Sequence, residues 1–321
     1  MRLTIVPESA VRQVATRRLM YDAIREALIA VASNDGILFP VTQGQTSAWS
    51  MGVKGGYVAS AEALGFKFGG YWPGNREHGL ASHSSTTVLI DPATGYPEAL
   101  VNASFLNCLR TAAADAVAVD ALARKDAASL CVLGAGHQSE FEIRAIADVR
   151  DLRLVKLWNR SPHAAGQLRA ALCDLDMEIM VAEREEAIAG ADIVVTVSAS
   201  REPLVRVEEI APGTHLSAMG ADQPGKQELA ADLVAQGKLF TDRIDQSISI
   251  GEFQHAVQAG LIAASDITPL GLVLSGAAPG RTDPSQITIF DSSGVAYQDL
   301  LAARAVLEAA GRAGLLTEID L

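Results

Sequence analysis

The stretch Ser129-Leu-Cys-Val-Leu-Gly-Ala-Gly-His-Gln-Ser139 constrains the fold of this chain more than any other. Its short apolar run ends at two glycines, and a segment with helical character follows from Glu140 to Val149. A second apolar run, Leu154 to Trp158, comes about 20 residues after the glycines. Strand, glycine-rich turn, helix and second strand at this spacing are typical of a dinucleotide-binding fold.

The two glycines have separate physical roles in such a turn. Gly134 allows backbone dihedrals that a side chain would resist, and Gly136 lets the backbone approach a pyrophosphate closely. The helix that follows presents unpaired N–H groups and the positive end of its dipole to that anion. Ser139 stands where the third glycine of the fingerprint is usual, so the motif is incomplete.

Length and charge narrow the function classes. A chain of 321 residues is long for one core, so two domains are expected. The net charge of -12 argues against nucleic acid and anionic membranes as partners. Three cysteines without disulfide or metal spacing predict reduced thiols, and the sequence contains neither a signal-peptide core nor an apolar run of membrane-spanning length. We therefore expect a soluble cytoplasmic protein.

The first third of the chain predicts a mixed, largely antiparallel sheet with a helix against it. A strand at Leu3 to Val6 precedes one helical pattern from Pro7 to Val31. Short glycine-rich and aromatic runs follow, and Ser85 to Ile90 with Tyr96 to Val101 form a hairpin signature around a turn.

The rest of the chain alternates between predicted strands and helices. An alanine-rich helix from Leu106 to Arg124 leads into the glycine-rich strand, and buried strands such as 192–198, 214–219, 239–242 and 287–290 follow, with helices between several of them. This alternation favours a doubly wound parallel sheet. The fold class expected is α/β, with a Rossmann-type domain and a separate α+β domain. A C-terminal helix at 298–313 could pack back onto the first region.

Four motifs occur in a fixed order along the chain: Arg110-Thr-Ala-Ala-Ala, Gly134-Ala-Gly-His-Gln-Ser139, Gly220-Ala-Asp-Gln-Pro-Gly-Lys226 and Phe290-Asp-Ser-Ser-Gly294. Together they resemble the ornithine cyclodeaminase/mu-crystallin family over nearly the whole chain. The resemblance implies a Rossmann domain at 116–296 and a substrate-binding and dimerisation domain at 1–115 with 297–321. It also implies a nicotinamide cofactor that acts on amino acids or imines, and a homodimer whose pairing covers the exposed sheet edges.

Asp222 resembles the family's catalytic carboxylate. It follows a predicted strand end, at the carboxyl edge where doubly wound sheets bind ligands. Imine reduction needs a hydride at carbon and a proton at nitrogen, and a carboxyl beside the nitrogen can supply or retain that proton. The alternative is that Asp222 caps a helix containing Glu228-Leu229. Lys226 in the same loop is either a substrate or cofactor contact or a solvated residue.

Two basic residues match the family's substrate ligands. Lys67 lies in an apolar strand between two phenylalanines, where an unpaired lysine is costly to bury. The resemblance makes it a ligand of the substrate carboxylate that also bears on proton transfer; the alternative is a strand-edge lysine that reaches water. Arg110 can hold a carboxylate with its planar fork, or instead pair with Asp115 or Asp120.

One departure from the family pattern bears on the substrate. Cyclodeaminases of the family carry an arginine just after the proline that corresponds to Pro40, where this chain has Val41. The segments Met51-Gly-Val-Lys-Gly-Gly56 and Tyr71-Trp-Pro-Gly-Asn75 resemble the imine reductases of the family, those of iminosuccinate among them, and offer Lys54 instead. Convergence of Lys54 with the two other cations would suit a dicarboxylate. Lys54 is otherwise an ordinary hairpin lysine.

The cofactor preference stays open in the sequence. Asn159 stands where NAD-binding folds carry an acid, and Arg160 follows it, which physically favours NADP(H), whereas the resemblance favours NAD(H). The resemblance also places Ser293 near the substrate, and no metal site is expected. The further cofactor contacts that it implies are Ser82, Ser84, Arg110, Thr111, Gly134, Gly136, His137, Gln138, Ser198, Ser217, Met219, Lys226 and Ser292.

Three functions follow from these residues. The first is a reductase that makes an L-amino acid, L-aspartate for iminosuccinate, from a 2-imino acid. The second is a cyclodeaminase, a lyase with catalytic NAD and no net cofactor consumption. The third is a non-enzymatic binder of a nucleotide and a ligand, which the presence of Asp222, Lys67 and Arg110 argues against.

Overall fold

The computed structural model describes residues 2–320 and divides the chain into two compact units. Unit 1 comprises the residues up to Thr111 together with those from Val295 onward, and unit 2 comprises Ala112–Gly294. None of the helices described combines the length and the hydrophobicity needed to cross a bilayer.

Unit 1 is built on one mixed sheet in the order β18-β1-β7-β6-β5-β4-β2, with β3 also pairing with β4. Its neighbouring strands are antiparallel except for β1 and β7. The strands are β1 (Arg2–Val6), β2 (Gly36–Leu38), β3 (Thr42–Gln45), β4 (Ser50–Val58), β5 (Ala63–Tyr71), β6 (His83–Ile90), β7 (Pro97–Asn102) and β18 (Thr317–Asp320). The helices are α1 (Glu8–Val14), α2 (Arg17–Ala32), α11 (Ala296–Arg312) and the first part of α3 (Ser104–Leu122), which continues into unit 2.

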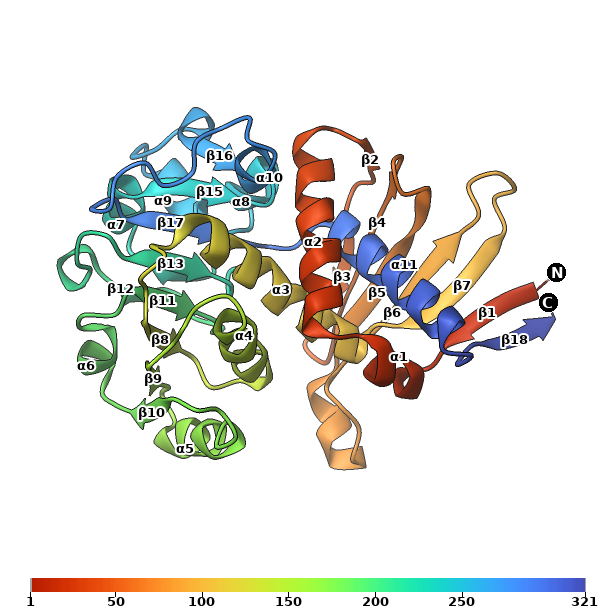
Figure 1. The fold of residues 1–321 in the computed structure, drawn as a ribbon, viewed down its shortest axis with the longest axis horizontal. Helices are drawn as coiled ribbons and strands as arrows, with labels where there is room; N and C mark the ends of the chain where they lie inside the picture. The colour runs from red at the N-terminus through yellow and green to blue at the C-terminus, as the bar shows by residue number, and fades with distance from the viewer. Residues whose placement is uncertain (1, 321) are drawn as a thin grey trace. The chain divides into compact units, whose positions relative to one another are not determined.

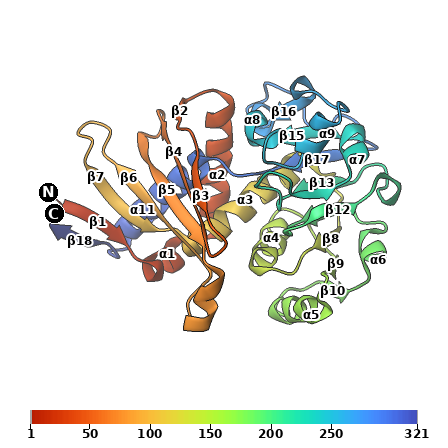
Figure 2. The same cartoon turned by 180° about the vertical axis from the view of Figure 1, so that it is seen from behind.

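Helices cover one face of this sheet. Helix α11 crosses the strands and α2 packs on α11, as Figure 1 shows. The glycines of β4 and β5 allow the close approach: a Cβ on Gly65 would lie 3.2 Å from a Leu300 methyl, and one on Gly56 would lie 3.2 Å from the Tyr297 ring. No helix of unit 1, within the described residues, lies over the opposite face, which is turned to the viewer in Figure 2.

The single helix expected from Pro7 to Val31 is wrong, because the structure has two. The first helix ends at Val14, and Ala15 leaves the helical region with ψ of 89°. Thr16 then begins α2, since its side-chain oxygen accepts a hydrogen bond from the Leu19 N–H at 3.1 Å. A threonine side-chain oxygen accepts well from the unpaired N–H groups at the start of a helix. A new helix therefore begins at this point, although the apolar periodicity continues across the break.

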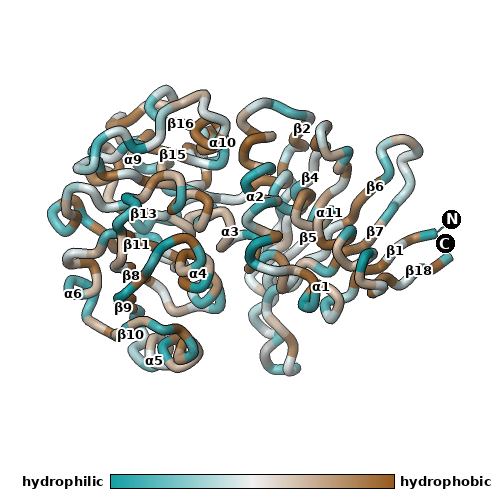
Figure 3. Tube along the Cα trace, in the orientation of Figure 1, coloured by the Kyte–Doolittle hydropathy of each residue, from teal (hydrophilic) through white to brown (hydrophobic). Residues whose placement is uncertain are grey.

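Unit 2 is a doubly wound parallel sheet, which confirms the fold class. Its strands follow the order β10-β9-β8-β11-β13-β17-β15-β16, all parallel. They are β8 (Ser129–Leu133), β9 (Leu154–Trp158), β10 (Glu178–Val181), β11 (Ile193–Thr196), β13 (His215–Ala218), β15 (Lys238–Thr241), β16 (Ile267–Pro269) and β17 (Thr288–Asp291). In Figure 3, hydrophobic colour follows the central strands β8 and β11, whose side chains are buried on both faces.

The remaining elements of unit 2 connect these strands. The helices are α4 (His137–Ala147), α5 (Pro162–Ala171), α6 (Arg184–Ile188), α7 (Ala231–Gln236), α8 (Ile244–Ser247), α9 (Gln254–Gln258) and α10 (Leu270–Leu274). A small parallel sheet pairs β12 (Arg201–Val205) with β14 (Gln227–Leu229). The chain order reverses direction between β8 and β11, and this switch point opens a crevice at the carboxyl ends of the strands.

One carboxylate fastens the start of β8 to the start of β11. Asp192 accepts hydrogen bonds from the Ala128 N–H at 3.0 Å and the Ser129 N–H at 3.0 Å, and it also pairs with Arg124. Burial by itself would raise the pKa of Asp192, but the hydrogen bonds and the arginine charge outweigh burial and lower the pKa overall.

We predict that Asp192→Asn lowers the free energy of unfolding by about 1–3 kcal/mol at pH 7, because an amide oxygen replaces a charged acceptor. A lowered pKa contributes stability above the unfolded value of about 3.9, and this contribution is lost as the pH falls through the folded value. Urea unfolding at pH 7 and at pH 3 should show the gap between wild type and variant closing in acid. Asp151→Asn, at an exposed carboxylate of the same unit, is the control, and an equal gap at both pH values would contradict the prediction.

Candidate active site

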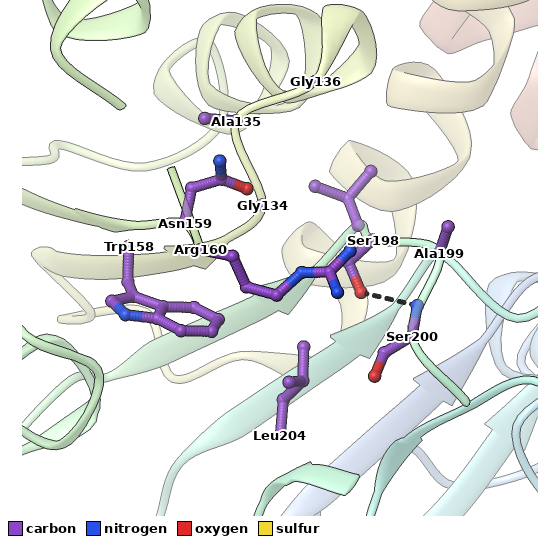
Figure 4. Close-up of a pocket in the computed structure, with 11 residues that line it drawn as sticks. Gly134, Ala135, Gly136, Trp158, Asn159, Arg160, Ser198, Ala199, Ser200 and Leu204 are labelled. Atoms are coloured by element: carbon purple, nitrogen blue, oxygen red, sulfur yellow. Dashed lines mark hydrogen bonds between the residues drawn. The ribbon is translucent and has the colours of Figure 1, made fainter. Parts of the chain in front are cut away.

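A pocket of about 360 Å³ lies at the carboxyl ends of β8, β9 and β11 in unit 2. Figure 4 shows its lining: the glycine loop on one side, Asn159 and Arg160 from the end of β9, and Ser198 from the end of β11. This is the switch-point crevice in which open α/β sheets bind ligands.

The glycine loop fits a pyrophosphate. Gly134 has φ of +128°, and a Cβ there would lie 2.7 Å from the Val197 carbonyl oxygen, so only glycine suits this turn. A Cβ on Gly136 would meet nothing within 4 Å, which leaves the backbone open toward the pocket. Ser139 replaces the third glycine of the fingerprint without loosening the loop: it is buried, and its hydroxyl donates to the Gly134 carbonyl at 3.0 Å.

Helix α4 begins at His137, three residues before the expected start at Glu140. Gly136 is its N-cap and makes no side-chain cap bond, so the first-turn N–H groups of His137 and Gln138 are the ones that a bound anion would meet. Their side chains are occupied elsewhere. The His137 ring packs edge-on against Phe141, and the Gln138 amide donates to Glu142 at 2.8 Å.

The position that selects between the two nicotinamide nucleotides has no acid. Asn159 follows β9 directly, and its amide donates to the Ser161 carbonyl at 3.2 Å. The Arg160 side chain extends across the pocket toward Ser198, as Figure 4 shows. Both residues therefore lie at the pocket, as the sequence predicted for the adenosine end of the cofactor.

A buried glutamate joins the loops that follow β11 and β13. Glu228 is fully buried in β14, and its carboxylate accepts the Ser198 N–H at 2.7 Å and the Gly220 N–H at 3.0 Å. It thereby joins the ends of β11 and β13, although burial raises its pKa. In the sequence, Glu228 was named only as part of a helix that Asp222 could cap, and its role as an anchor for the two loops was missed. The local sequence gave no clear signal, because Lys226 and Gln227 precede Glu228 and only the residues after it are apolar.

Asp222 lies in the loop after β13, and its side chain is 53% exposed. Lys226 donates to Asp222 Oδ1 at 2.6 Å and to the Gly220 carbonyl at 3.1 Å, so the lysine orients the carboxylate. The alternative that Asp222 caps a helix containing Glu228 is wrong, because Glu228 and Leu229 belong to strand β14. Met219, at the end of the same strand β13, is buried.

Three predicted serines of unit 2 are buried. The Ser217 hydroxyl contacts His215 Nε2 at 3.2 Å within the unit, and a cofactor contact of Ser217 stays a prediction. The hydroxyl of Ser292 donates to Asp242 at 2.8 Å. Ser293 follows Ser292 in the loop after β17.

In unit 1, Lys67 lies on β5 between β4 and β6, so the strand-edge alternative is wrong. Its side chain is 12% exposed and lies on the helix-covered face, where Nζ donates to Asp299 at 2.7 Å and to Asn107 at 2.8 Å. The neighbouring Phe66 and Phe68 point to the opposite face. Burial lowers the pKa of Lys67 to about 7; Asp299 opposes this shift, whereas the charges of Arg110 and Lys54 add to it.

Arg110 joins the same cluster. Its guanidinium lies 3.1 Å from Asp299, and it donates to Asn107 at 2.8 Å and to Gln298 at 3.1 Å. Pairing with Asp115 or Asp120 is therefore wrong; Asp120 binds Arg150 and Lys125 instead. Lys54 is the cross-strand partner of Lys67, on the same face of the sheet. The three cations that the sequence singled out thus come together in unit 1.

The other predicted cofactor contacts of unit 1 lie at the start of β6 and within α3. Ser82 precedes β6, Ser84 lies within it, and Thr111 donates to the Asn107 carbonyl from α3 at 2.8 Å. Their contact with a cofactor stays a prediction. Within residues 2–320, no three His, Cys, Asp or Glu side chains gather into a group that could hold a metal ion.

Sequence reasoning missed the polar partners of the cations, Asn107, Gln298 and Asp299. Asp299 lies in the first turn of α11, where every neighbour from Ala296 to Ala303 is buried. An acid inside a fully buried helical stretch was the signal, because such an acid requires a cationic partner.

Comparison with known proteins agrees with this architecture. The sequence model of the ornithine cyclodeaminase/mu-crystallin family matches residues 13–313. Iminosuccinate reductase of Paracoccus denitrificans is 41% identical over 322 residues, which covers 99% of this chain and 100% of that protein. Its crystal structure in complex with NAD+ superposes with a TM-score of 0.96, at 40% identity and full coverage of both chains.

Two further solved structures are similar over the whole chain. An archaeal alanine dehydrogenase dimer with bound NAD gives a TM-score of 0.94 at 31% identity, with 100% of both chains covered. The Δ1-pyrroline-2-carboxylate reductase of Thermococcus litoralis, in complex with NADH and L-proline, gives 0.91 at 26% identity and covers 99% of this chain and 100% of that one. Because the family model matches residues 13–313 and a relative is 41% identical over 99% of the chain, this chain belongs to the ornithine cyclodeaminase/mu-crystallin family.

Proposed function

We propose that this protein is an NAD(H)-dependent imine reductase that converts a 2-imino dicarboxylic acid, iminosuccinate, to the L-amino acid, L-aspartate. The observation that carries the proposal is the group of three cations, Lys54, Lys67 and Arg110, around the single carboxylate of Asp299. With Lys67 protonated, the group has a net charge of +2, which matches a dianionic substrate. The similarity to iminosuccinate reductase over the full chain supports the same substrate.

The side chains divide the chemistry between them. Bound NADH would supply the hydride for the imine carbon. Arg110 and Lys67 bind substrate carboxylate through charge-assisted hydrogen bonds, and Lys54 adds the charge for the second carboxylate. Asp222, oriented by Lys226, retains the proton on the imine nitrogen and stabilises its positive charge. In this proposal unit 2 binds the nucleotide, unit 1 binds the substrate, and Ser293 lies near the substrate.

The nucleotide proposed is NAD(H). Asn159 can donate and accept hydrogen bonds with a ribose diol, and the similar structures of iminosuccinate reductase and alanine dehydrogenase hold NAD. Arg160 at the same pocket could instead meet a 2′-phosphate, so the two nucleotides must be compared directly.

The cyclodeaminase alternative has less support in this chain. Val41 stands in place of the family's arginine and is 41% exposed in the turn between β2 and β3. The three cations of unit 1 would also repel the side-chain ammonium of ornithine. A protein that only binds a nucleotide and a ligand would not need a carboxylate held in place by a lysine, whereas here Lys226 donates to Asp222 at 2.6 Å. A cytoplasmic location stays a prediction.

We predict reductase activity that prefers a dicarboxylate. NADH and NADPH absorbance should be followed side by side while oxaloacetate or pyruvate forms an imine with ammonium in place. The dicarboxylic imine should be reduced with the higher kcat/KM, by about 10-fold or more, because a second ion pair in a half-buried site contributes at least about 1.4 kcal/mol. NADH should be the better donor.

Lys54→Gln is the matched test of that preference, since it should reduce the ratio between the two imines and leave the pyruvate-derived rate nearly unchanged. Ornithine-dependent ammonia release without net nucleotide consumption would instead establish the lyase and reject the reductase. Equal rates with both imines would reject the dicarboxylate assignment alone.

Asp222→Asn should lower kcat by about 10²–10⁴-fold, the range typical of a lost acid–base group. Cofactor affinity, measured by the quenching of protein fluorescence, should stay within about twofold, because the nucleotide pocket lies at other residues. Asp245→Asn, which removes a 63% exposed carboxylate of the same unit, is the control. A variant with near-normal turnover would show that Asp222 only holds Lys226.

We further propose that the protein is a homodimer, paired through the helix-free face of the unit 1 sheet. This face carries the apolar side chains of Met51, Val53, Tyr57, Phe66 and Phe68, and Met51 and Phe68 are 41% and 40% exposed. A contiguous apolar sheet face without a helical layer marks an association surface. The alanine dehydrogenase with the similar fold is a dimer.

Phe68→Asp should weaken association by about 2 kcal/mol or more, or roughly 30-fold in Kd, because it places a charge at the centre of the apolar face. Light scattering after size-exclusion chromatography should then show monomer at micromolar concentration. Leu261→Asp, at a 50% exposed leucine of unit 2, should leave the dimer intact. A dimer that survives Phe68→Asp and dissociates with Leu261→Asp would place the interface elsewhere.

A further inference from the structure

The C-terminal helix contributes a carboxylate to the cation cluster of unit 1. Asp299 Oδ1 lies 2.7 Å from Lys67 Nζ and 3.1 Å from Arg110 Nε, so one oxygen serves both cations. Its side chain is 3% exposed. Asn107 is a second shared partner, because it accepts from Lys67 and from Arg110, at 2.8 Å each. The two cations are therefore linked by two common acceptors from different helices.

Several polar atoms around this cluster have no hydrogen-bond partner within the described residues. They are buried, and they come from β6 of the sheet and from the first turn of α11: Ser85 Oγ, Thr87 Oγ1, Gln298 Nε2 and Asp299 Oδ2. Thr87 is the cross-strand partner of Lys67. Buried polar atoms are seldom left unpaired in a folded protein, so this group indicates a site that a polar ligand completes.

The charges that face Lys67 explain why a carboxylate is needed there. Lys54 comes from β4, Arg110 from α3 and Asp299 from α11, while Thr87 on β6 is uncharged. Burial and the two cations all favour the neutral amine of Lys67, and Asp299 is the one group among these that favours the ammonium. In return, burial would raise the pKa of Asp299, but Lys67 and Arg110 outweigh it and lower that pKa.

We propose that Asp299 is the positioning residue of this site: it favours the charged form of Lys67 and holds Lys67 and Arg110 side by side, so that their remaining N–H donors face one substrate carboxylate. An ammonium has three N–H donors, and Lys67 uses two of them on Asp299 and Asn107. Asp299 acts through Lys67 and Arg110 and needs no contact with the substrate. The inference deepens the proposed function, because it states how the carboxylate-binding cations are kept charged.

A direct titration tests the proposal without any substrate. In protein labelled with ¹³C at the lysine ε-carbons, the Lys67 signal is identified by its loss in Lys67→Arg. Its midpoint should lie near pH 7 in the wild type, and lower by about one unit or more in Asp299→Asn, since an adjacent opposite charge is typically worth that much. Glu98→Gln is the matched control. It also breaks an ion pair to helix α11, between Glu98 of β7 and Arg304, but that pair does not involve Lys67.

The pH dependence of kcat/KM is the second readout. Wild type and Asp299→Asn should both lose activity as the pH rises, because Lys67 becomes neutral, but the variant should lose it at a lower pH, through a higher KM for the imino acid. The variant should recover to within about tenfold of wild type as the pH falls below its new midpoint. Asp299→Glu should restore part of the activity at neutral pH, and NADH affinity should be unchanged in both variants.

The outcomes are distinct. A Lys67 midpoint that is the same in wild type and Asp299→Asn, together with an activity loss that is uniform over pH, would reduce Asp299 to a structural counter-ion and overturn the proposal. A wild type that reduces no imine would reject the proposed function, and the ¹³C titration would still decide the role of Asp299.

Discussion

A cationic lysine inside a protein persists only if a carboxylate or other acceptor replaces the water that it has lost, and unit 1 depends on this constraint. Lys67 lies on the central strand β5, and neither β5 nor its neighbours β4 and β6 contain an Asp or Glu that could pair with it. The acid comes from α11, more than 200 residues later in the chain, at Asp299. The packing of α11 on the sheet therefore also brings Asp299 to Lys67. The same helix–sheet contact stabilises the fold of unit 1 and completes the cluster of charged side chains.

In unit 2, buried carboxylates hold the loops that follow the parallel strands. Its strands are parallel, so all of their loops with ligand-binding potential emerge at one edge. Loops held only by their own backbone would be loose. Here the buried Glu228 joins the Ser198 loop to the Gly220 loop, and Glu252 in turn accepts the N–H groups of Glu228 and Leu229 at 2.8 and 2.6 Å. Burial and the charge of Glu228 raise the pKa of Glu252 well above its usual range.

Local patterns in the sequence predicted much of this. The strand at Leu154–Trp158 matches the bounds of the second apolar run, and the hairpin of β6 and β7 forms around Asp91 as its turn residues indicated, because both signals are carried by neighbouring residues. The pairings between strands that are far apart in the sequence were not predicted. Strand β18 pairs with β1 across the entire chain, and β12 pairs with β14 in a small sheet. Neither has a strong local period, since each gains its stability from a partner strand that is distant in sequence.

The same distinction between local and long-range features holds for the candidate site. Gly134, Gly136 and Asn159 could be named from the sequence, because the turn, the dipole and the strand end that give them a role are local features, whereas Asp222 was named from the family resemblance. The partners of Lys67 and Arg110 could not: sequence left Arg110 between Asp115 and Asp120, and the tertiary structure gave it Asp299 and Gln298 instead. Spacing along the chain determines which face of an element a residue occupies. Only the packing of one element on another decides which charge it meets, because a buried ion pair forms where desolvation is shared and not where residues are close in sequence.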